Sequence, residues 1–436
     1  MTAAGLAMPS PALVAIGVLV LGGVVLLLLV EPISSRPIRA TVAGAPFPVV
    51  AAIFGFQAPG SLGLAAVALC AVALIALSLL GSLQAEVPAQ AAESAALLLL
   101  GSAGALAMAS AGDLLQLVVG LETLALSAVI LVAVGRGQQP LEAAFKYFVL
   151  GAISLAGLLY GLGLVYLSTG SFGFPTAAQL GANPLTLSGV VLVALGIAFE
   201  LAIFPLHWGA LDAYTAAAPS LAGFVMSASK LAAAFALGRL ALETGSSLQQ
   251  VLVWLGAATI LWGTFGALAQ SRNFRRMLAY SAVTHAGFIA LATGSGASGP
   301  LAAAFYAAAY ASMAMLVFAA LAGPRAADLT ALDPLRSGAL ALGLFSLAGI
   351  PPTPGFWAKL AVLVVAWQAA GVVPTLIAVG GGVFSVLYYL RPLPDLFGAM
   401  RRGGAAAPAP GVALAAALLV VLGLAPGLAW GLAQGS

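Results

Sequence analysis

The chain has 436 residues, of which 63% are hydrophobic and only 6% are charged, and its mean hydropathy is +1.14. A soluble globular domain carries about 25% charged residues, so this composition excludes a water-facing surface and requires the lipid bilayer as solvent. The net charge of +3 includes no basic cluster, which excludes nucleic acid as a partner.

The apolar segments are close to twenty residues long, and this length predicts transmembrane α-helices. A helix needs about 20 apolar residues to span a bilayer, whereas barrel strands show segments of about ten residues with alternating hydrophobicity. Helices are favoured because a lipid-exposed backbone must satisfy its own hydrogen bonds. The first segment lacks a preceding basic stretch, so we expect a retained helix and not a cleaved signal.

In chain order the sequence predicts about fourteen spans. They cover residues 11–29, 43–56, 62–83, 95–110, 114–134, 143–167, 186–206, 221–241, 248–268, 277–293, 301–321, 339–370, 374–390 and 412–432. The second of these spans is short, and the twelfth is long and interrupted. No soluble domain fits between them, so we expect a single transmembrane domain over residues 1–436.

The arginines give a separate test of this count, because cytoplasmic loops are rich in positive charge. Eleven of the twelve arginines lie in or beside odd-numbered loops, and the exception, Arg239, lies near the end of the eighth span. The eleven are Arg36, Arg39, Arg136, Arg272, Arg275, Arg276, Arg325, Arg336, Arg391, Arg401 and Arg402. This one-sided pattern supports fourteen spans and predicts that both termini lie outside a prokaryotic plasma membrane.

Two of the spans contain helix-breaking residues. Pro205 lies in the seventh span, and residues 349–355 (GIPPTPG) interrupt the twelfth, since proline removes a backbone donor and clashes with the preceding turn. Pro205 alone is also compatible with a simple kink. Irregular backbone at membrane depth is tolerated only where it is buried or lines a watery cavity. The breaks are five helices apart, which predicts two inverted five-helix repeats over approximately 95–243 and 248–392.

All three lysines, Lys146, Lys230 and Lys359, fall within predicted spans, whereas the arginines fall almost wholly outside them. Arginine stays protonated in proteins, but a lysine in a low-dielectric site can release its proton. Placing a charge at the bilayer centre costs roughly 2.5–3.5 kcal/mol on insertion scales. The three lysines therefore predict a site that takes up and releases protons. For Lys146 the alternative is snorkelling, and for Lys230 it is a structural ion pair.

Three further titratable residues are candidates for the same path. Glu122 lies near the middle of the fifth span, and Glu200, five residues before Pro205, is a natural counter-charge for Lys230 on the next helix. His285 lies in the tenth span, and histidine titrates near neutral pH. A structural role in helix packing is the alternative for Glu122 and His285. His207 is either a relay residue or a loop residue at the membrane surface.

The sequence contains no motif for an intrinsic cofactor or metal. It has no Walker A run, no Gly-x-Gly-x-x-Gly within a soluble βαβ unit, no CxxC and no HExxH. Two histidines and one cysteine, far apart, are too few for an intrinsic haem, iron–sulfur or zinc site. We therefore expect no cofactor in this chain, and Cys70 is expected to be a packing residue.

Several segments resemble the antiporter-like membrane subunits of respiratory complex I. They are residues 120–127 (GLETLALS), 141–152 (LEAAFKYFVLGA), 276–287 (RMLAYSAVTHAG) and 347–359 (LAGIPPTPGFWAK). The second segment is most similar to subunit N of NADH:quinone oxidoreductase, and the resemblance extends roughly from Asp113 to Arg391. It implies fourteen helices, inverted five-helix repeats and broken seventh and twelfth helices.

The resemblance also implies a role for named residues. The family's fifth-helix glutamate corresponds to Glu122, its lysines of helices six, eight and twelve to Lys146, Lys230 and Lys359, and its tenth-helix histidine to His285. The family usually has Phe-Lys in helix seven, whereas this chain has Phe-Glu at 199–200. The usual lysine is thus replaced by Glu200, with the opposite charge.

The implied function is proton translocation by a membrane subunit of NADH:quinone oxidoreductase. Such a subunit holds no redox centre, is coupled to quinone reduction elsewhere, and lies in the bilayer beside other antiporter-like subunits. Alternatives are a subunit of a multisubunit cation/proton antiporter or of a membrane-bound hydrogenase, and an unrelated solute transporter. Glu200 favours a further alternative, a scaffold subunit that has lost transport.

Overall fold

The computed structural model describes residues 10–29, 37–83, 90–135, 137–322, 328–403 and 410–434. All regular secondary structure within these ranges is helical. Eleven helices of the described chain are long and apolar enough to cross a membrane, or twelve if the bent pair at Pro410–Leu424 and Pro426–Leu432 forms one span. The prediction of an all-helical, multi-span membrane protein is therefore confirmed.

The helices up to the first interruption are α1 (Pro11–Leu28), α3 (Pro37–Gly44), α4 (Pro46–Gly55), α5 (Ser61–Ser78), α6 (Leu80–Leu83), α7 (Ala91–Ala109), α8 (Leu114–Ala133), α9 (Gln138–Thr169), α10 (Ala177–Ala182) and α11 (Pro184–Leu201). Those that follow are α12 (Trp208–Ala216), α13 (Pro219–Thr244), α14 (Ser246–Ala269), α15 (Phe274–Thr293), α16 (Gly299–Leu321), η1 (Leu329–Ala331), α17 (Pro334–Ala348), α18 (Pro354–Ala369), α19 (Val372–Leu390), α20 (Leu393–Arg402), α21 (Pro410–Leu424) and α22 (Pro426–Gln434). The short second span of the prediction corresponds to α3 and α4 together, which form one apolar stretch over Ile38–Gly55.

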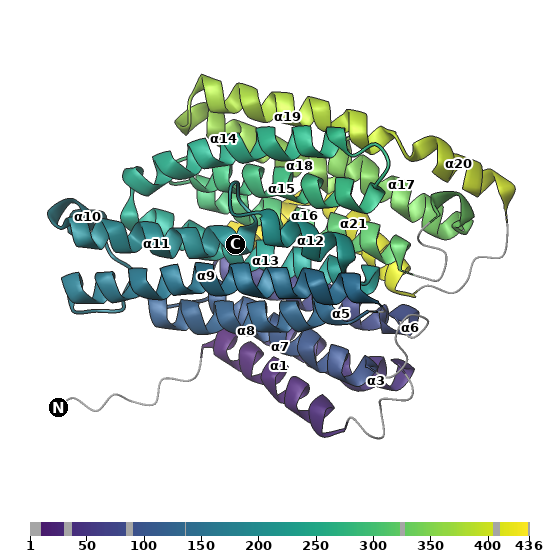
Figure 1. Ribbon diagram of the computed structural model, residues 1–436, viewed down its shortest axis with the longest axis horizontal. Coiled ribbons are helices and arrows are strands. Elements are labelled where there is room, and N and C mark those ends of the chain that lie inside the picture. Colours follow the sequence, from purple (N-terminus) through teal and green to yellow (C-terminus); the bar gives the residue numbers. More distant parts are fainter. Residues whose placement is uncertain are drawn as a thin grey trace.

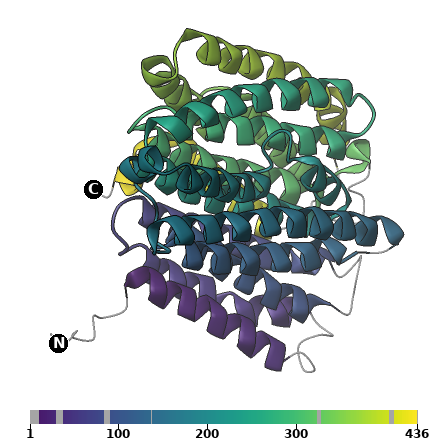
Figure 2. The ribbon, with the colours of Figure 1, turned by 60° about the vertical axis from the view of Figure 1, so that its left-hand side comes forward.

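The long helices lie side by side, and α13 and α16 pack together at the centre of the bundle (Figure 1). The most apolar window of α13 is completely buried, and that of α16 is 94% buried. By contrast, only 22% of the most apolar window of α9 is buried, so this helix lies at the periphery. Figure 2 shows α1 at one edge of the stack and α19 at the other. The deepest positions in the fold therefore belong to α13, α16 and the helices that contact them.

Close packing between neighbouring helices depends on small residues. A side chain at Gly104 of α7 would meet the backbone of α8, and one at Gly120 of α8 would meet the backbone of α7. The α14–α15 pair packs in the same way, through Gly256 and Gly287. Without a hydrophobic effect between helices in lipid, such backbone approach supplies much of the packing energy.

Both predicted interruptions are present as helix ends. At the first interruption α11 ends at Leu201, Ala202 adopts a left-handed φ of 65°, and α12 begins at Trp208. At the second interruption α17 ends at Ala348, Gly349 has a φ of 86°, and α18 begins at Pro354. A cis peptide bond precedes a proline in each interruption, at Phe204–Pro205 and Pro351–Pro352.

The arginine-rich connections occupy one end of the bundle. Helices α3 and α20, which carry Arg39, Arg401 and Arg402, lie at the right-hand end of Figure 1, and α10 lies at the opposite end. Arg36, Arg136 and Arg325 of the predicted pattern lie outside the described residues. The described part of the pattern is thus consistent with a bundle whose basic loops share one side.

Candidate functional site

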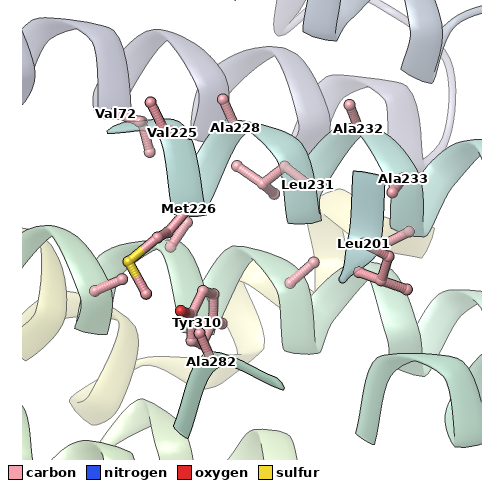
Figure 3. Close-up of a cluster of buried hydrophobic side chains, with 14 of the residues drawn as sticks. Val72, Leu201, Val225, Met226, Ala228, Leu231, Ala232, Ala233, Ala282 and Tyr310 are labelled. Atoms are coloured by element: carbon pink, nitrogen blue, oxygen red, sulfur yellow. The ribbon is translucent and has the colours of Figure 1, made fainter. Parts of the chain in front are cut away.

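Lys230 lies at the centre of the bundle. Its side chain, near the middle of α13, is 0% exposed, and its Nζ lies 5.0 Å from the ring centroid of Tyr214 and 5.4 Å from that of Tyr310. No hydrogen-bond acceptor for this Nζ lies within the described part of the chain. Figure 3 shows a cluster of buried hydrophobic side chains that includes Met226 and Leu231 of α13 together with Tyr310 of α16. The burial predicted for Lys230 is therefore observed.

Glu200 lies at the last turn of α11, where the interruption begins. Its side chain is buried, and it accepts a hydrogen bond from the Ser229 hydroxyl, one residue before Lys230. The carboxylate interacts electrostatically with Lys230, but the described residues include no direct ion pair between them. Ser229 is thus the immediate partner of Glu200, and the role of Glu200 as the counter-charge of Lys230 stays a prediction.

A cavity of about 170 Å³ connects Glu122 with Glu200. It lies among α8, α9 and α11, and its remaining lining is mainly apolar, with the Tyr147 ring on one wall. A polar cavity needs only about 10–15 Å³ of accessible volume for each water molecule. The volume exceeds that of a few water molecules, but only the two carboxyl groups, Tyr147 and Ser154 bring polar side chains to the mainly apolar wall.

Lys146 differs from the other two lysines, because its side chain is 49% exposed. Its Nζ lies 2.6 Å from Glu142 Oε1 and 3.6 Å from Asp212 Oδ2. Asp212 also accepts a hydrogen bond of 2.5 Å from Arg276. Lys146 therefore forms an ion pair with Glu142 one turn earlier on α9, and it is not buried within this chain. Its position on α9 places it on the outer surface, and position within a span alone does not reveal this.

His285 of α15 is buried in a cluster of tyrosines. Its Nδ1 lies 2.7 Å from the Tyr306 hydroxyl, and its Nε2 lies 3.0 Å from the Tyr389 hydroxyl. The Tyr389 hydroxyl is also hydrogen-bonded to Ser281, one turn before His285 on α15. The Tyr310 ring, which contacts Lys230, lies 5.0 Å from the His285 ring. These aromatic groups place His285 in the same buried cluster as Lys230.

Lys359 is held at the second interruption. Its Nζ donates hydrogen bonds to the carbonyl oxygens of Leu347 and Ala348, at 2.9 and 2.8 Å, and to Ser385 Oγ at 3.2 Å. The carbonyls at a helix end lack intrahelical partners, so the end of α17 supplies acceptors to this ammonium group. Glycine is favoured at position 349 because its φ of 86° is left-handed, and an added Cβ there would also lie 3.0 Å from Lys359 Cδ and 3.4 Å from its Nζ.

His207 follows the first interruption and is buried, so it is not a surface loop residue. The Trp262 indole Nε1–H donates a hydrogen bond of 2.8 Å to His207 Nε2. Because indole can only donate, this nitrogen must be an unprotonated acceptor. The backbone N–H of Phe204 likewise donates to Thr259 Oγ1 at 3.2 Å. Both contacts attach the interruption to α14, so His207 has a structural role here.

The sequence patterns described above do not reveal the tyrosines of this site. Tyr214, Tyr306, Tyr310 and Tyr389 lie on three different helices and are all buried. A signal was available in α16, where Tyr306 and Tyr310 are four residues apart and therefore share one helix face. Within the described residues, no group of three or more His, Cys, Asp or Glu side chains could hold a metal ion.

Comparison with known proteins places this arrangement in a family. Residues 111–385 match the family described as NADH:quinone oxidoreductase/Mrp antiporter, transmembrane. NADH-quinone oxidoreductase subunit N of Deinococcus radiodurans is 36% identical over 367 residues, which is 78% of this chain and 74% of the relative. The same subunit of Halorhodospira halophila is 39% identical over 350 residues, or 75% of this chain and 72% of the relative.

Solved structures agree with this relationship. A chain of respiratory complex I from Thermus thermophilus is 29% identical, with a TM-score of 0.79, over 97% of this chain and all (100%) of that one. A chain of the archaeal membrane-bound sulfane sulfur reductase has a TM-score of 0.82 at 24% identity, over 98% of this chain and 97% of that one, and shows the shared fold alone. The protein belongs to the NADH:quinone oxidoreductase/Mrp antiporter transmembrane family.

Proposed function

We propose that the chain is a proton-translocating membrane subunit of NADH:quinone oxidoreductase. The observation that carries this proposal is a pair of lysine ammonium groups, Lys230 and Lys359, buried on either side of the His285 cluster. Intramembrane ionisable groups are rare, and they mark proton or ion pathways. Relatives at 36% and 39% identity are subunit N of that enzyme, which favours this function over that of an Mrp-type antiporter.

We infer a route that begins at Glu122 and reaches Glu200 through the cavity between them. The Ser229 hydroxyl then bridges towards Lys230, and the tyrosine cluster leads on through His285 towards Lys359. Each of these groups can bind and release a proton except serine, which passes a proton only by exchanging hydrogen bonds.

Lys146 belongs to the proposed path at its arginine-rich end. Its ammonium group is shared between two carboxylates there. The redox chemistry that drives proton movement takes place in partner subunits, and this chain contributes the membrane route.

We further propose fourteen spans arranged as two inverted five-helix repeats, over approximately 95–243 and 248–392. The two spans beyond the twelve are α15 and the interrupted α17–α18 pair. Twenty residues of α15 extend about 30 Å at 1.5 Å per residue, which matches the hydrocarbon core. The two interruptions, at the ends of α11 and α17, occupy corresponding places in the two repeats.

We place the subunit in a prokaryotic plasma membrane, with both termini on the outer side and the arginine-rich end in the cytoplasm. We propose that its neighbours are other membrane subunits of the complex, antiporter-like ones among them. The exposed face of α9 carries large apolar side chains, which suit either lipid or a neighbouring transmembrane helix. These side chains include Leu141, Phe145, Phe148, Ile153 and Tyr160.

The test replaces Lys230 by methionine, which has similar bulk and no charge, in the assembled enzyme reconstituted in liposomes. We expect fewer protons pumped per NADH oxidised, because the central proton-binding group is gone. Ser227→Ala is the matched control, since Ser227 is also fully buried on α13, and it should leave the ratio unchanged. Native gel electrophoresis checks assembly. An assembled Lys230→Met enzyme with the wild-type ratio would overturn the proposal and support the scaffold function that Glu200 favours.

A further inference from the structure

The two ring nitrogens of His285 each contact a phenol from a different helix. Tyr306 of α16 lies 2.7 Å from Nδ1, and Tyr389 of α19 lies 3.0 Å from Nε2. Ser281 of α15 is hydrogen-bonded to the same Tyr389 hydroxyl. All four side chains are at most 2% exposed. They form one continuous row of hydrogen bonds in the order Tyr306, His285, Tyr389 and Ser281.

When its members are neutral, a continuous donor-to-acceptor chain can run through this row in only two directions. A neutral imidazole donates from one nitrogen and accepts at the other, and a phenol has a single proton to donate. If Tyr306 donates to Nδ1, then Nε2–H donates to Tyr389, and Tyr389 donates to Ser281. If Ser281 donates to Tyr389 and Tyr389 donates to Nε2, every bond in the row is reversed. In a continuous chain the hydrogen bonds therefore all point towards Ser281 or all point towards Tyr306.

We propose, on the basis of the proposed function, that Tyr306 and Tyr389 are proton-transferring residues and that this row carries protons across the His285 region. A hydronium ion gives a proton to the Tyr306 oxygen, and Tyr306 gives its own proton to Nδ1. Nε2 then releases its proton to Tyr389, Tyr389 gives its proton to Ser281, and Ser281 gives its proton to water. One proton enters and one leaves, every group is neutral again, and the row has changed direction.

The position of the row between the two buried lysines supports this role. On one side, the Tyr310 ring contacts both His285 and the Lys230 Nζ, at 5.0 and 5.4 Å. On the other side, the Phe288 ring stacks on Tyr306 at 5.5 Å and lies 5.9 Å from Lys359 Nζ. Changes of charge at either lysine therefore act at short range on the row, through surroundings of low dielectric constant.

The first experiment replaces each phenol by a ring without oxygen, as Tyr306→Phe and Tyr389→Phe, in the assembled enzyme in liposomes. A positioned proton-transfer group is worth about 10²–10⁴-fold in rate. We therefore expect each variant to lower the protons pumped per NADH as far as His285→Ala does. The double variant should lower the ratio no further, because one missing oxygen already interrupts the row.

Tyr388→Phe is the matched control. Tyr388 neighbours Tyr389 on α19 and is equally buried, and its hydroxyl forms no hydrogen bond with His285. The control loses the same atom from the same helix, so we expect it to pump as the wild-type enzyme does. A loss of pumping in Tyr388→Phe equal to that in Tyr389→Phe would show a general packing effect and would overturn the inference.

A second readout separates proton transfer from packing and applies even if a phenylalanine variant fails to assemble. Incorporation of 3-fluorotyrosine at position 389 keeps the hydroxyl and almost the same shape, but fluorine makes the phenol more acidic. A proton-transferring Tyr389 predicts that pumping is retained with its pH profile displaced to lower pH. A residue that only fills space predicts an unchanged profile, and that result would contradict the inference.

The outcome for Lys230→Met distinguishes this inference from the function on which it rests. If Lys230→Met lowers the pumping ratio while assembled Tyr306→Phe and Tyr389→Phe retain it, the tyrosine row is wrong and the proposed function stands. If Lys230→Met also retains the wild-type ratio, the proposed function itself fails.

Discussion

Lys230 and Lys359 are both buried, but their ammonium groups have different surroundings. Lys359 donates to two carbonyls and one hydroxyl, whereas Lys230 faces the rings of Tyr214 and Tyr310. Hydrogen bonds from a charged donor are roughly twice as strong as neutral ones. A proton on Lys359 is therefore compensated directly by oxygen atoms. We expect Lys230 to release its proton more readily than Lys359 does.

Replacing Lys359 by arginine tests whether the charge itself or its release is required. Lys359→Arg keeps a positive group that can donate to the same carbonyls, but arginine does not lose its proton in proteins. We expect an assembled enzyme that oxidises NADH and pumps fewer protons per NADH. Arg239→Lys, on the exposed side of α13 where the guanidinium lies over Phe174, is the control and should pump normally. Wild-type pumping by Lys359→Arg would show that proton release from this residue is not needed.

At the level of elements, the interruption between α17 and α18 has the clearest link to the site. The end of α17 leaves carbonyls that Lys359 uses, and Gly349 has the left-handed backbone that turns the chain there. Because the lysine and the helix end satisfy each other, the position of the ammonium depends on the shape of the interruption. Changes to the backbone are therefore expected to act on proton pumping.

Gly349→Ala and Gly170→Ala form a matched pair for this idea. Both glycines have left-handed backbone, with φ of 86° and 70°, so each alanine is expected to cost about 1–2 kcal/mol of stability. An added Cβ meets Lys359 at position 349 and finds open space at position 170. We expect similar losses of thermal stability, measured by melting of the purified enzyme, but lower pumping only for Gly349→Ala. Equal pumping in both variants would remove the link between this turn and the lysine.

Sequence alone reveals those parts of the site that contrast with their surroundings. Lys230 and the proline-rich break at 349–355 stand out from apolar helix, so the sequence predicts both. Tyr306 and Tyr389 do not stand out, because tyrosine is itself partly apolar and the two lie 83 residues apart in the chain. Their meeting at His285 depends on how α15, α16 and α19 pack. Helix rotation, likewise a tertiary property, decides that Lys146 is exposed and that Ser229 is the partner of Glu200.

At the scale of the whole molecule, Asp212 connects the two proposed repeats. It lies on α12 in the first repeat and bonds both Lys146 of α9 and Arg276 of α15, which belongs to the second. The three groups are partly exposed, and exposed ion pairs contribute roughly 0.2–1 kcal/mol each. The network is therefore too weak to hold the fold together, but its ionic contacts can be exchanged readily between partners.

Asp212→Asn should therefore change proton transfer more than stability. We expect the melting temperature to change little, while pumping falls because Lys146 is left with Glu142 as its only carboxylate partner among the described residues. Asp333→Asn serves as the comparison variant, because Asp333 pairs with Arg336 at 3.3 Å and both residues lie at the start of the same helix. A large drop in melting temperature for Asp212→Asn without loss of pumping would contradict this expectation.

The hydrogen bonds between Lys359 and the end of α17 couple protonation to the positions of helices. The ammonium group of Lys359 on α18 is hydrogen-bonded to two carbonyls of α17 and to a hydroxyl of α19, and so links the three helices. When the proton departs, a neutral amine with fewer and weaker donors remains, and the hydrogen bonds between the three helices weaken. The three helices would then be freer to shift, so occupancy by a single proton would be converted into a displacement that an adjoining subunit can sense.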